Sequence, residues 1–417
     1  MEKTIYRFAS LALIFTPFTV WFALNEYLKL NFLFICIAFV LDLIYCIFNK
    51  DNRLFVRQAN TKSQRLSIII FLGFVVLSFI INMFFNKQPK LVSNFIGTFA
   101  IIFLLYYYYG SLIQKYVPIN KCIKLLAYSC LLLMLIIFVD SILVNFFNVR
   151  IHEWFIFGYK GNTDYFNRLL WSSPCSPCEE PGAAAQYLNV LIPFFFLYFK
   201  GKIKVFGVIL YAFCLFSLFS TTGIVTLLLI SSFLWFEKVK SIGKIIVISF
   251  ICLLSLSTIV LYNNNDVFKN FIDQLAIVDK VSFSGNTDSD TQRSEGMGLA
   301  IANGLQSPIW GMGPGYGKSV LETGYLSTFL TFLGSYGFIA FFAFIAFWFS
   351  FIRKASKLNP KMRNYFLFSI LACTVAAIIG DILHSFILWV LLPIINKAYN
   401  EDRVLANKTS KKNIDFK

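Results

Sequence analysis

Two segments of this chain combine residue types that suit binding of an anion such as phosphate. In the first, Arg168 is followed by Glu179, Glu180, Pro181 and Gly182, which lead directly into an apolar stretch. Glu180 fits the residue before a helix and Pro181 fits the first helical position. The free N–H groups and the dipole of a helix that begins here would favour a bound anion. The alternative is an ordinary helix start without a ligand.

The second segment is a glycine-rich run that follows Arg293. It contains the residues Gly311, Gly313, Gly315, Tyr316, Gly317 and Lys318. Backbone N–H groups of such a turn can surround a phosphate group, although a purely structural turn explains the composition equally well. The run is not a nucleotide-binding P-loop, because Met312 occupies the place of the required first glycine and no strand precedes it.

These segments lie between long apolar stretches that are typical of membrane-spanning helices. The chain is 58% hydrophobic and only 14% charged, and its mean hydropathy is +0.70. A helix needs about 20 apolar residues to cross a bilayer. We therefore predict an all-α, polytopic membrane protein that forms a single membrane domain over 1–417. The twelve predicted spans are 8–24, 27–48, 66–85, 92–112, 122–147, 183–199, 203–219, 223–236, 244–262, 324–352, 364–380 and 382–396.

Two of the apolar blocks are interpreted as hairpins of two spans each. Residues 203–236 would extend over about 51 Å as one helix, which is too long for one crossing. The polar sequence from Ser220 to Gly223 divides this block, and Gly380 with Asp381 divides the block 364–396.

The distribution of basic residues predicts the orientation in the membrane. With the N-terminus inside, 27 of the 37 lysines and arginines fall on the cytoplasmic side, as the positive-inside rule requires. The net charge of +16 therefore reflects membrane anchoring, and no nucleic acid is needed to explain it. Both termini are predicted to be cytoplasmic, the tail 397–417 to be solvated and partly disordered, and the long loops 148–182 and 263–323 to lie outside.

Several ionisable residues are predicted within or beside spans, where charged groups are often functional. Asp140, Asp381 and His384 fall near the outer side, so they are candidates for substrate binding, although each could instead pair with a neighbour. Asp42 lies nearer the cytoplasmic side, where we expect it to be paired or to reach the interface.

Cys175 and Cys178 are the two cysteines of the first outer loop. A disulfide between them is allowed in that compartment. Two sulfur atoms without a second pair do not form a zinc site, so no metal is expected.

In their order along the chain, these motifs resemble the O-antigen polymerase and O-antigen ligase superfamily. The similarity covers roughly 160 to 340. It rests on Arg168, the sequence from Glu180 to Ala184, Ser220 to Gly223, Arg293, Ser307 to Gly313, and Gly334 to Gly337.

The resemblance implies an enzyme of the bacterial cytoplasmic membrane that acts on undecaprenyl-pyrophosphate-linked oligosaccharide at the outer membrane face, without a metal or other cofactor. Arg168 and Arg293 match the functional arginines of the family; Arg150 is the only other arginine placed outside. Guanidinium groups suit the leaving pyrophosphate. A carboxylate would serve as a base for the attacking sugar hydroxyl, with Glu180 as first choice and Glu179 as second.

Three functions remain open at this point. A polymerase would join repeat units, with a flippase and a chain-length regulator as expected partners. A ligase would transfer glycan from the same carrier, but Thr323 stands where the ligase histidine is expected. A lipid-glycan transporter or flippase would not need the long loop 263–323 or the outer arginines.

Overall fold

The computed structural model describes residues 1–23, 29–49, 53–56, 60–86, 88–155, 166–168, 171–238, 288–321, 324–383 and 385–414. Within these ranges, the backbone alone is described for some residues, among them Arg168 and Arg293. The predicted span 244–262 and the residue His384 lie outside the described residues.

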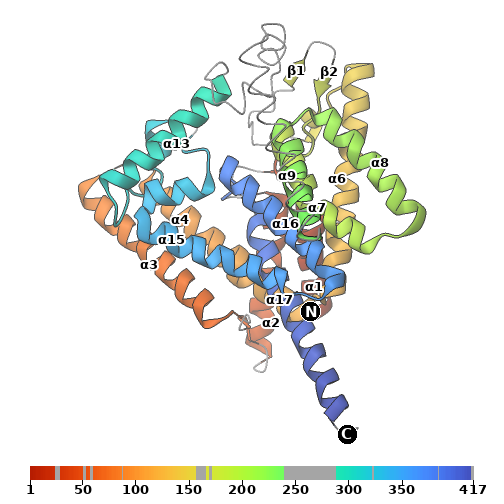
Figure 1. Cartoon of the computed structure of the whole chain (residues 1–417). Helices are drawn as coiled ribbons and strands as arrows, with labels where there is room; N and C mark the ends of the chain where they lie inside the picture. The colour runs from red at the N-terminus through yellow and green to blue at the C-terminus, as the bar shows by residue number, and fades with distance from the viewer. Residues whose placement is uncertain are drawn as a thin grey trace.

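The described chain is a bundle of helices with one short pair of strands (Figure 1). The first half contains α1 (Glu2–Ile14), α2 (Leu30–Phe48), α3 (Lys62–Phe85), α4 (Leu91–Ile101), the π-helix η1 (Ile102–Tyr109), α5 (Gly110–Tyr116), α6 (Ile119–Phe147) and the 3-10 helix η2 (Ile151–Phe155). The antiparallel strands β1 (Phe166–Arg168) and β2 (Trp171–Ser173) follow. The second half contains α7 (Pro181–Tyr198), α8 (Gly201–Leu218), α9 (Thr221–Lys238), α13 (Asp288–Gln306), α14 (Tyr316–Val320), α15 (Thr328–Ser356), α16 (Pro360–Ile379) and α17 (Phe386–Ile414).

The helices confirm the prediction of an all-α membrane protein. In the described part of the chain, seven helical segments are long and apolar enough to cross a membrane. They are Leu30–Phe48, Lys62–Phe85, Leu91–Tyr116, Ile119–Phe147, Gly201–Leu218, Thr328–Ser356 and Pro360–Ile379. The total of twelve spans stays a prediction.

Both predicted breaks in the apolar blocks are present, whereas a membrane crossing by α9 and by α17 stays a prediction. Helix α8 ends at Leu218, and Phe219 takes a left-handed backbone conformation with φ of 45° before α9 begins at Thr221. The Ser220 hydroxyl accepts a hydrogen bond from the N–H of Gly223 at 3.2 Å, which caps the new helix. In the second block, α16 ends at Ile379 and α17 begins at Phe386.

The predicted first span, 8–24, is wrong in its position. Helix α1 already ends at Ile14, because Pro17 disfavours helical backbone in the residue before it. The hydroxyl of Thr16 donates to the Leu13 carbonyl at 2.6 Å and closes the last turn. The following segment then contacts the first long loop, through a hydrogen bond from the N–H of Val20 to the Pro177 carbonyl at 3.3 Å.

The prediction of a partly disordered tail is also wrong for most of the tail. Helix α17 continues to Ile414 and projects beyond the bundle (Figure 1). Its first part is held by the buried Lys397, whose Nζ donates to the carbonyls of Ile113 at 2.8 Å and Gln114 at 3.2 Å. These carbonyls end α5, where a cation is electrostatically favourable.

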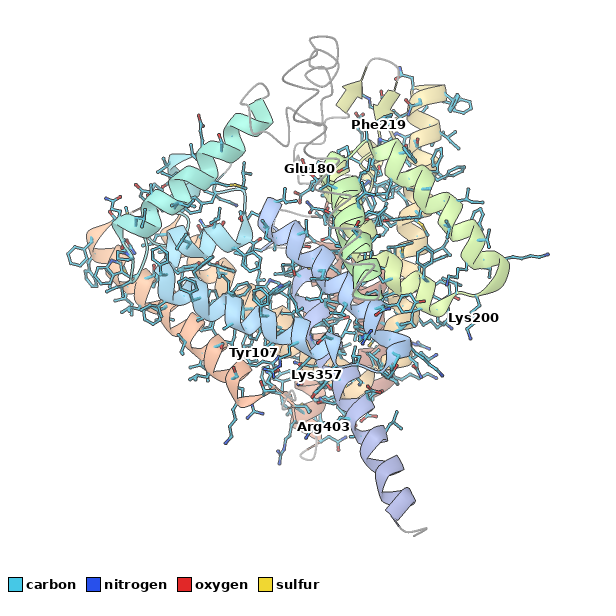
Figure 2. The ribbon with its side chains drawn as sticks, in the orientation of Figure 1. Tyr107, Glu180, Lys200, Phe219, Lys357 and Arg403 are labelled. Atoms are coloured by element: carbon cyan, nitrogen blue, oxygen red, sulfur yellow. The ribbon has the colours of Figure 1, made fainter. Side chains whose placement is uncertain are left out.

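The bundle has two ends, which we call the basic face and the loop face. Lys200, Lys357 and Arg403 lie at the basic face, together with both chain termini (Figures 1 and 2). Glu180 and Phe219 lie at the opposite end, the loop face, together with β1 and β2. Lys200, Lys357 and Arg403 therefore share one face, as the positive-inside count predicts, whereas the side of the membrane that each face occupies stays a prediction.

Asp42 confirms the expectation of a paired charge. Its carboxylate is fully buried and forms an ion pair with Lys115 at 3.3 Å, and the Tyr116 hydroxyl donates to it at 3.0 Å. A buried carboxylate with two such partners acts as a structural link between α2 and α5.

The orientation can be tested with three exposed positions. Single cysteines from Lys357→Cys at the basic face and from Lys202→Cys, two residues after Lys200, should not react with a membrane-impermeant maleimide in intact cells. Ser319→Cys, in the predicted outer loop 263–323, should react. The reason is the excess of basic residues at the first face. Native Cys36, Cys46 and Cys252 are replaced in every variant to lower the background. All three positions should react after the membrane is permeabilised. The reverse pattern in intact cells would show that the topology is opposite to the predicted one.

Candidate functional site

Glu180 stands at the loop face, at the start of α7 as predicted (Figure 2). Its backbone is extended, its side chain is exposed, and Pro181 occupies the first helical position. The carboxylate folds over the first turn, because its Oε1 lies 3.4 Å from the place that a Cβ on Gly182 would take. The negative charge therefore lies beside the positive end of the helix dipole.

Glu179 has a different environment. Its Oε1 forms an ion pair with the buried Lys29 at 3.1 Å. This pair joins the loop before α7 to the residue before α2. Glu179 thus pairs with Lys29, and Glu180 is exposed at the loop face.

The loop before these glutamates is packed beneath the loop face. Cys175 and Cys178 are buried free thiols rather than a disulfide. Burial raises the pKa of both thiols, which keeps them protonated and unreactive. The Cys178 thiol donates to the Pro17 carbonyl at 3.3 Å, and the Ser176 N–H donates to the fully buried Asp140 at 3.3 Å. Asp140 was predicted to bind substrate, but its observed contact is with this loop.

The glycine-rich segment packs against a kink in α15. Gly337 has φ of 81°, which interrupts the helix. The freed carbonyls of Gly334 and Ser335 accept hydrogen bonds from the N–H groups of Met312 and Gly313, each at 3.0 Å. Non-helical backbone at membrane depth requires such internal partners. Met312 and Gly313 therefore serve the fold, and their N–H groups are not available to a phosphate.

Side chains of α3 hold the same segment from the other side. The Asn82 amide donates to the Gly311 carbonyl at 3.2 Å, and the Ser78 hydroxyl donates to the Ser335 carbonyl at 2.8 Å. Gly311 has φ of 66° and is buried. The structural interpretation of the first two glycines, which the sequence left open, is thus supported by their contacts.

The second half of the glycine-rich segment, from Gly315 to Lys318, borders a small cavity of about 30 Å³. Gly315, Lys318 and Asp381 all line it, so the structure brings together three of the predicted binding residues from two distant segments. Tyr316 lies between the first two and begins α14. The carboxylate of Asp381 is positioned by the Leu383 N–H at 3.2 Å and the Thr328 hydroxyl at 3.4 Å. The volume is enough for one or two water molecules but not for a sugar.

Sequence analysis did not identify the other walls of this cavity. They include Asn94 and Thr98 of α4, Tyr325, and Thr331 and Tyr336 of α15. The Thr98 and Tyr336 hydroxyls are 3.3 Å apart, and the buried Thr331 hydroxyl has no hydrogen-bond partner in the described part of the chain. Tyr336 lies inside the motif Gly334 to Gly337, which was the one available signal for it.

Tyr325 links the glycines to the cavity. Its ring lies 2.8 Å from the positions that Cβ atoms on Gly317 and Gly334 would occupy, so both residues must lack a side chain. The Asn303 amide donates to its hydroxyl at 2.8 Å. Burial raises the pKa of Tyr325, so the hydroxyl stays neutral at physiological pH.

The two predicted arginines are placed by their backbones. Arg168 ends β1, where it pairs with Trp171 of β2, and Arg293 lies in the first half of α13. Helix α13 packs against α15, and both α13 and the strands lie toward the loop face (Figure 1).

The described residues contain no group of three or more histidine, cysteine, aspartate or glutamate side chains that could hold a metal ion. Comparisons of the chain with models of known protein families and with curated proteins gave no match.

Proposed function

We propose that this protein is a polysaccharide polymerase. It joins oligosaccharide repeat units carried on undecaprenyl pyrophosphate, at the outer face of the bacterial cytoplasmic membrane. The proposal rests on the resemblance described above, together with the placement of the motif residues in the fold.

One observation supports the proposal most. Segments that are far apart in the chain lie toward the loop face: β1 with Arg168, the start of α7 with Glu180, and α13 with Arg293. Helix α13 packs against α15, and the glycine-rich segment is docked on the kink of α15. A glycan polymerase needs anion-binding groups and a base at one membrane face, because its lipid carrier presents the pyrophosphate at the interface.

In the proposed reaction, a hydroxyl group of the acceptor sugar attacks the anomeric carbon of the donor. The new glycosidic C–O bond forms as the bond between that carbon and the pyrophosphate oxygen breaks. Glu180 accepts the hydroxyl proton, and undecaprenyl pyrophosphate leaves with the electron pair. The guanidinium groups of Arg168 and Arg293 stabilise the negative charge that develops on the leaving oxygen.

The small cavity has a supporting role in this proposal. Lys318 offers a cation for a phosphate oxygen, and Asp381 offers an acceptor for a sugar hydroxyl. Because the cavity holds only about two waters, substrate would contact its opening and not fill it.

The purified full-length protein in detergent provides the direct test. Given only the undecaprenyl-pyrophosphate repeat unit, it should produce a ladder of longer lipid-linked chains without nucleotide, metal or a second acceptor. Chain length is measured by gel electrophoresis or mass spectrometry of the lipid fraction. The control is Glu180→Gln, which preserves size but cannot act as a base, and should make no ladder.

A different product pattern would identify a different function. If the protein extended nothing but transferred preformed polymer to a separate acceptor, it would be a ligase. If it only moved the intact lipid-linked unit across a vesicle membrane, it would be a transporter, and the polymerase proposal would fail.

A further inference from the structure

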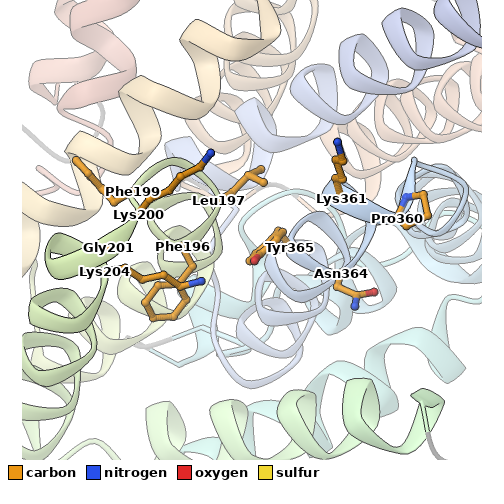
Figure 3. Close-up of a pocket in the computed structure, with 10 residues that line it drawn as sticks. All are labelled: Phe196, Leu197, Phe199, Lys200, Gly201, Lys204, Pro360, Lys361, Asn364 and Tyr365. Carbon is orange, nitrogen blue, oxygen red and sulfur yellow. The ribbon is translucent and has the colours of Figure 1, made fainter.

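A large pocket lies at the basic face, far along the bundle from the candidate site. Its volume is about 720 Å³, within the usual range for ligand pockets. The walls come from the end of α7, the start of α8 and the start of α16 (Figure 3). Its lining includes the aromatic residues Phe196, Phe199 and Tyr365 and the basic residues Lys200, Lys204 and Lys361.

The charge around the pocket is positive. Lys200 and Lys204 lie on one side and Lys361 on the other, with Tyr365 between the two sides (Figure 3). None of the lining residues is acidic. The Lys204 ammonium lies 5.6 Å from the centre of the Phe196 ring, which orients this cation against an apolar wall.

The lysines are placed where the helices themselves disfavour them. Lys200 precedes α8, and Lys204 follows within its first turns, yet no acidic residue lies in the first turn of α8. Lys361 occupies the first turn of α16, where its own N–H and that of Met362 donate to the Asn359 side chain at 3.1 and 3.2 Å. At α8, which has no side-chain cap, the positive end of the helix dipole adds to the lysine charges, and a bound anion would relieve this repulsion.

The two walls of the pocket are rigidly joined, so the site does not depend on a movable loop. Phe194 of α7 packs edge-to-face on Phe366 of α16, with ring centres 5.3 Å apart. The Ser369 hydroxyl donates to the Val190 carbonyl, which links the same helices deeper in the bundle.

The neighbouring surface of α8 is apolar and exposed. Ile203, Phe206 and Ile209 are 51%, 53% and 65% exposed and follow one another at helical spacing. α8 is also one of the seven segments long and apolar enough to cross a membrane. An anion that carries hydrocarbon chains could place its charge among the lysines and its chains along this surface.

We propose that the pocket binds the phosphate head group of an anionic phospholipid from the leaflet at the basic face. The lysines and the start of α8 recognise the phosphate, the aromatic and apolar walls cover the glycerol region, and α8 receives the acyl chains. Basic pockets between membrane helices are suited to such head groups. This site is separate from the proposed catalytic site at the loop face.

Lipid binding by the purified full-length protein tests the proposal. Short-chain phosphatidylglycerol, phosphatidylcholine and inorganic phosphate are each titrated and followed by native mass spectrometry. Wild-type protein should prefer phosphatidylglycerol. The triple variant that combines Lys200→Gln, Lys204→Gln and Lys361→Gln should weaken that binding by about tenfold or more. The reason is that the attraction of each lysine to a lipid phosphate adds to the free energy of binding.

The matched control removes the same charge outside the pocket. It combines Lys121→Gln, Lys202→Gln and Lys357→Gln, three exposed lysines that do not line the pocket, and it should bind phosphatidylglycerol within about twofold of wild type. An equal loss in both triple variants would show only a general attraction to the basic face and overturn the proposal.

Two further outcomes would also overturn it. Equal affinity for phosphatidylcholine would exclude recognition of an anionic head group. Competition by inorganic phosphate at equal affinity would indicate a site for a soluble anion. If the triple variant does not fold, the single variants Lys204→Gln and Lys361→Gln replace it, and unchanged binding in both would contradict the proposal.

Discussion

Gly337→Ala is expected to destabilise the protein strongly. Gly337 has φ of 81°, a conformation that strains a residue with a side chain. A Cβ there would lie 2.7 Å from the carbonyl atoms of Ile309 and 2.7 Å from the Pro308 carbonyl oxygen. Those atoms are backbone, and Pro308 accepts the Phe338 N–H at 2.8 Å, so they cannot move without breaking the docking of the glycine-rich segment. We expect a loss of roughly 3 kcal/mol or more.

The measurement is the thermal midpoint and the monodisperse fraction of protein purified in detergent. Gly298→Ala is the matched control, because no atom lies within 4 Å of its added Cβ and its residue lies within helix α13. That variant should be unchanged or slightly more stable, by up to about 1 kcal/mol. Equal midpoints for Gly337→Ala and wild type would mean that the kink of α15 is not required for the fold.

This prediction also separates two interpretations of the glycine-rich segment. If its glycines served only to expose N–H groups to phosphate, replacing Gly337, which lies outside the segment, would leave the segment intact. In the structure, the N–H groups of Met312 and Gly313 are engaged by α15, and Gly311 has no room for a side chain beside Ser335. The glycines thus permit backbone to approach backbone.

Local sequence signals were sufficient for two of the helix breaks. A block too long for one crossing must turn, and Ser220 and Gly380 mark where the chain does so. The start of α7 at Pro181 was likewise predictable, because proline suits the first helical position. Charge counting assigned Lys200, Lys357 and Arg403 to one side, and these three residues lie at one end of the bundle.

Features that depend on distant contacts could not be predicted. The early end of α1 follows from Pro17, but the hydropathy of the surrounding residues masked it. The helical tail depends in part on Lys397 reaching the end of α5, a contact across most of the chain. The ion pair between Lys29 and Glu179 was also unpredictable, because nothing near either residue in the sequence indicates the other.

The candidate site also depends on contacts between distant residues, which the sequence alone does not predict. Sequence motifs identified Lys318 and Asp381 separately, but not that they line one cavity. Thr98 and Thr331 lie within apolar helices, where a threonine is common and carries no signal of its own. Their contribution becomes visible only once α4 and α15 are packed together, with Tyr336 between them.

Arg168→Ala and Arg293→Ala are each expected to abolish polymer formation while the protein still reaches the membrane at near-normal levels. Under the proposed function, each guanidinium stabilises charge that develops as the pyrophosphate leaves, and removal of one such donor typically slows a reaction by about 100-fold to 1,000-fold. The measurement is the initial rate of chain extension by purified protein. Membrane level is measured by quantitative immunoblot, so that a folding defect is not read as a catalytic one.

Arg150→Ala provides the matched control for both variants. Arg150 belongs to the same predicted outer loop as Arg168, is exposed, and forms an ion pair with Glu153 at 3.6 Å. An exposed pair of this kind contributes little to stability, and no family motif includes it, so its loss should leave the rate within about twofold of wild type. If Arg150→Ala were as inactive as the other two, the general positive charge of the loop would be responsible.

Replacement by lysine then distinguishes the two ways in which an arginine can act on a phosphate. Lysine keeps the charge but offers a compact ammonium in place of a planar fork that donates two parallel hydrogen bonds. We therefore expect Arg168→Lys and Arg293→Lys to recover only part of the rate. Full recovery would mean that the site needs a positive charge and not bidentate recognition. Full activity in Arg293→Ala would remove α13 from the reaction and leave Lys318, which is already positioned at the cavity, as the residue to test next for contact with the pyrophosphate.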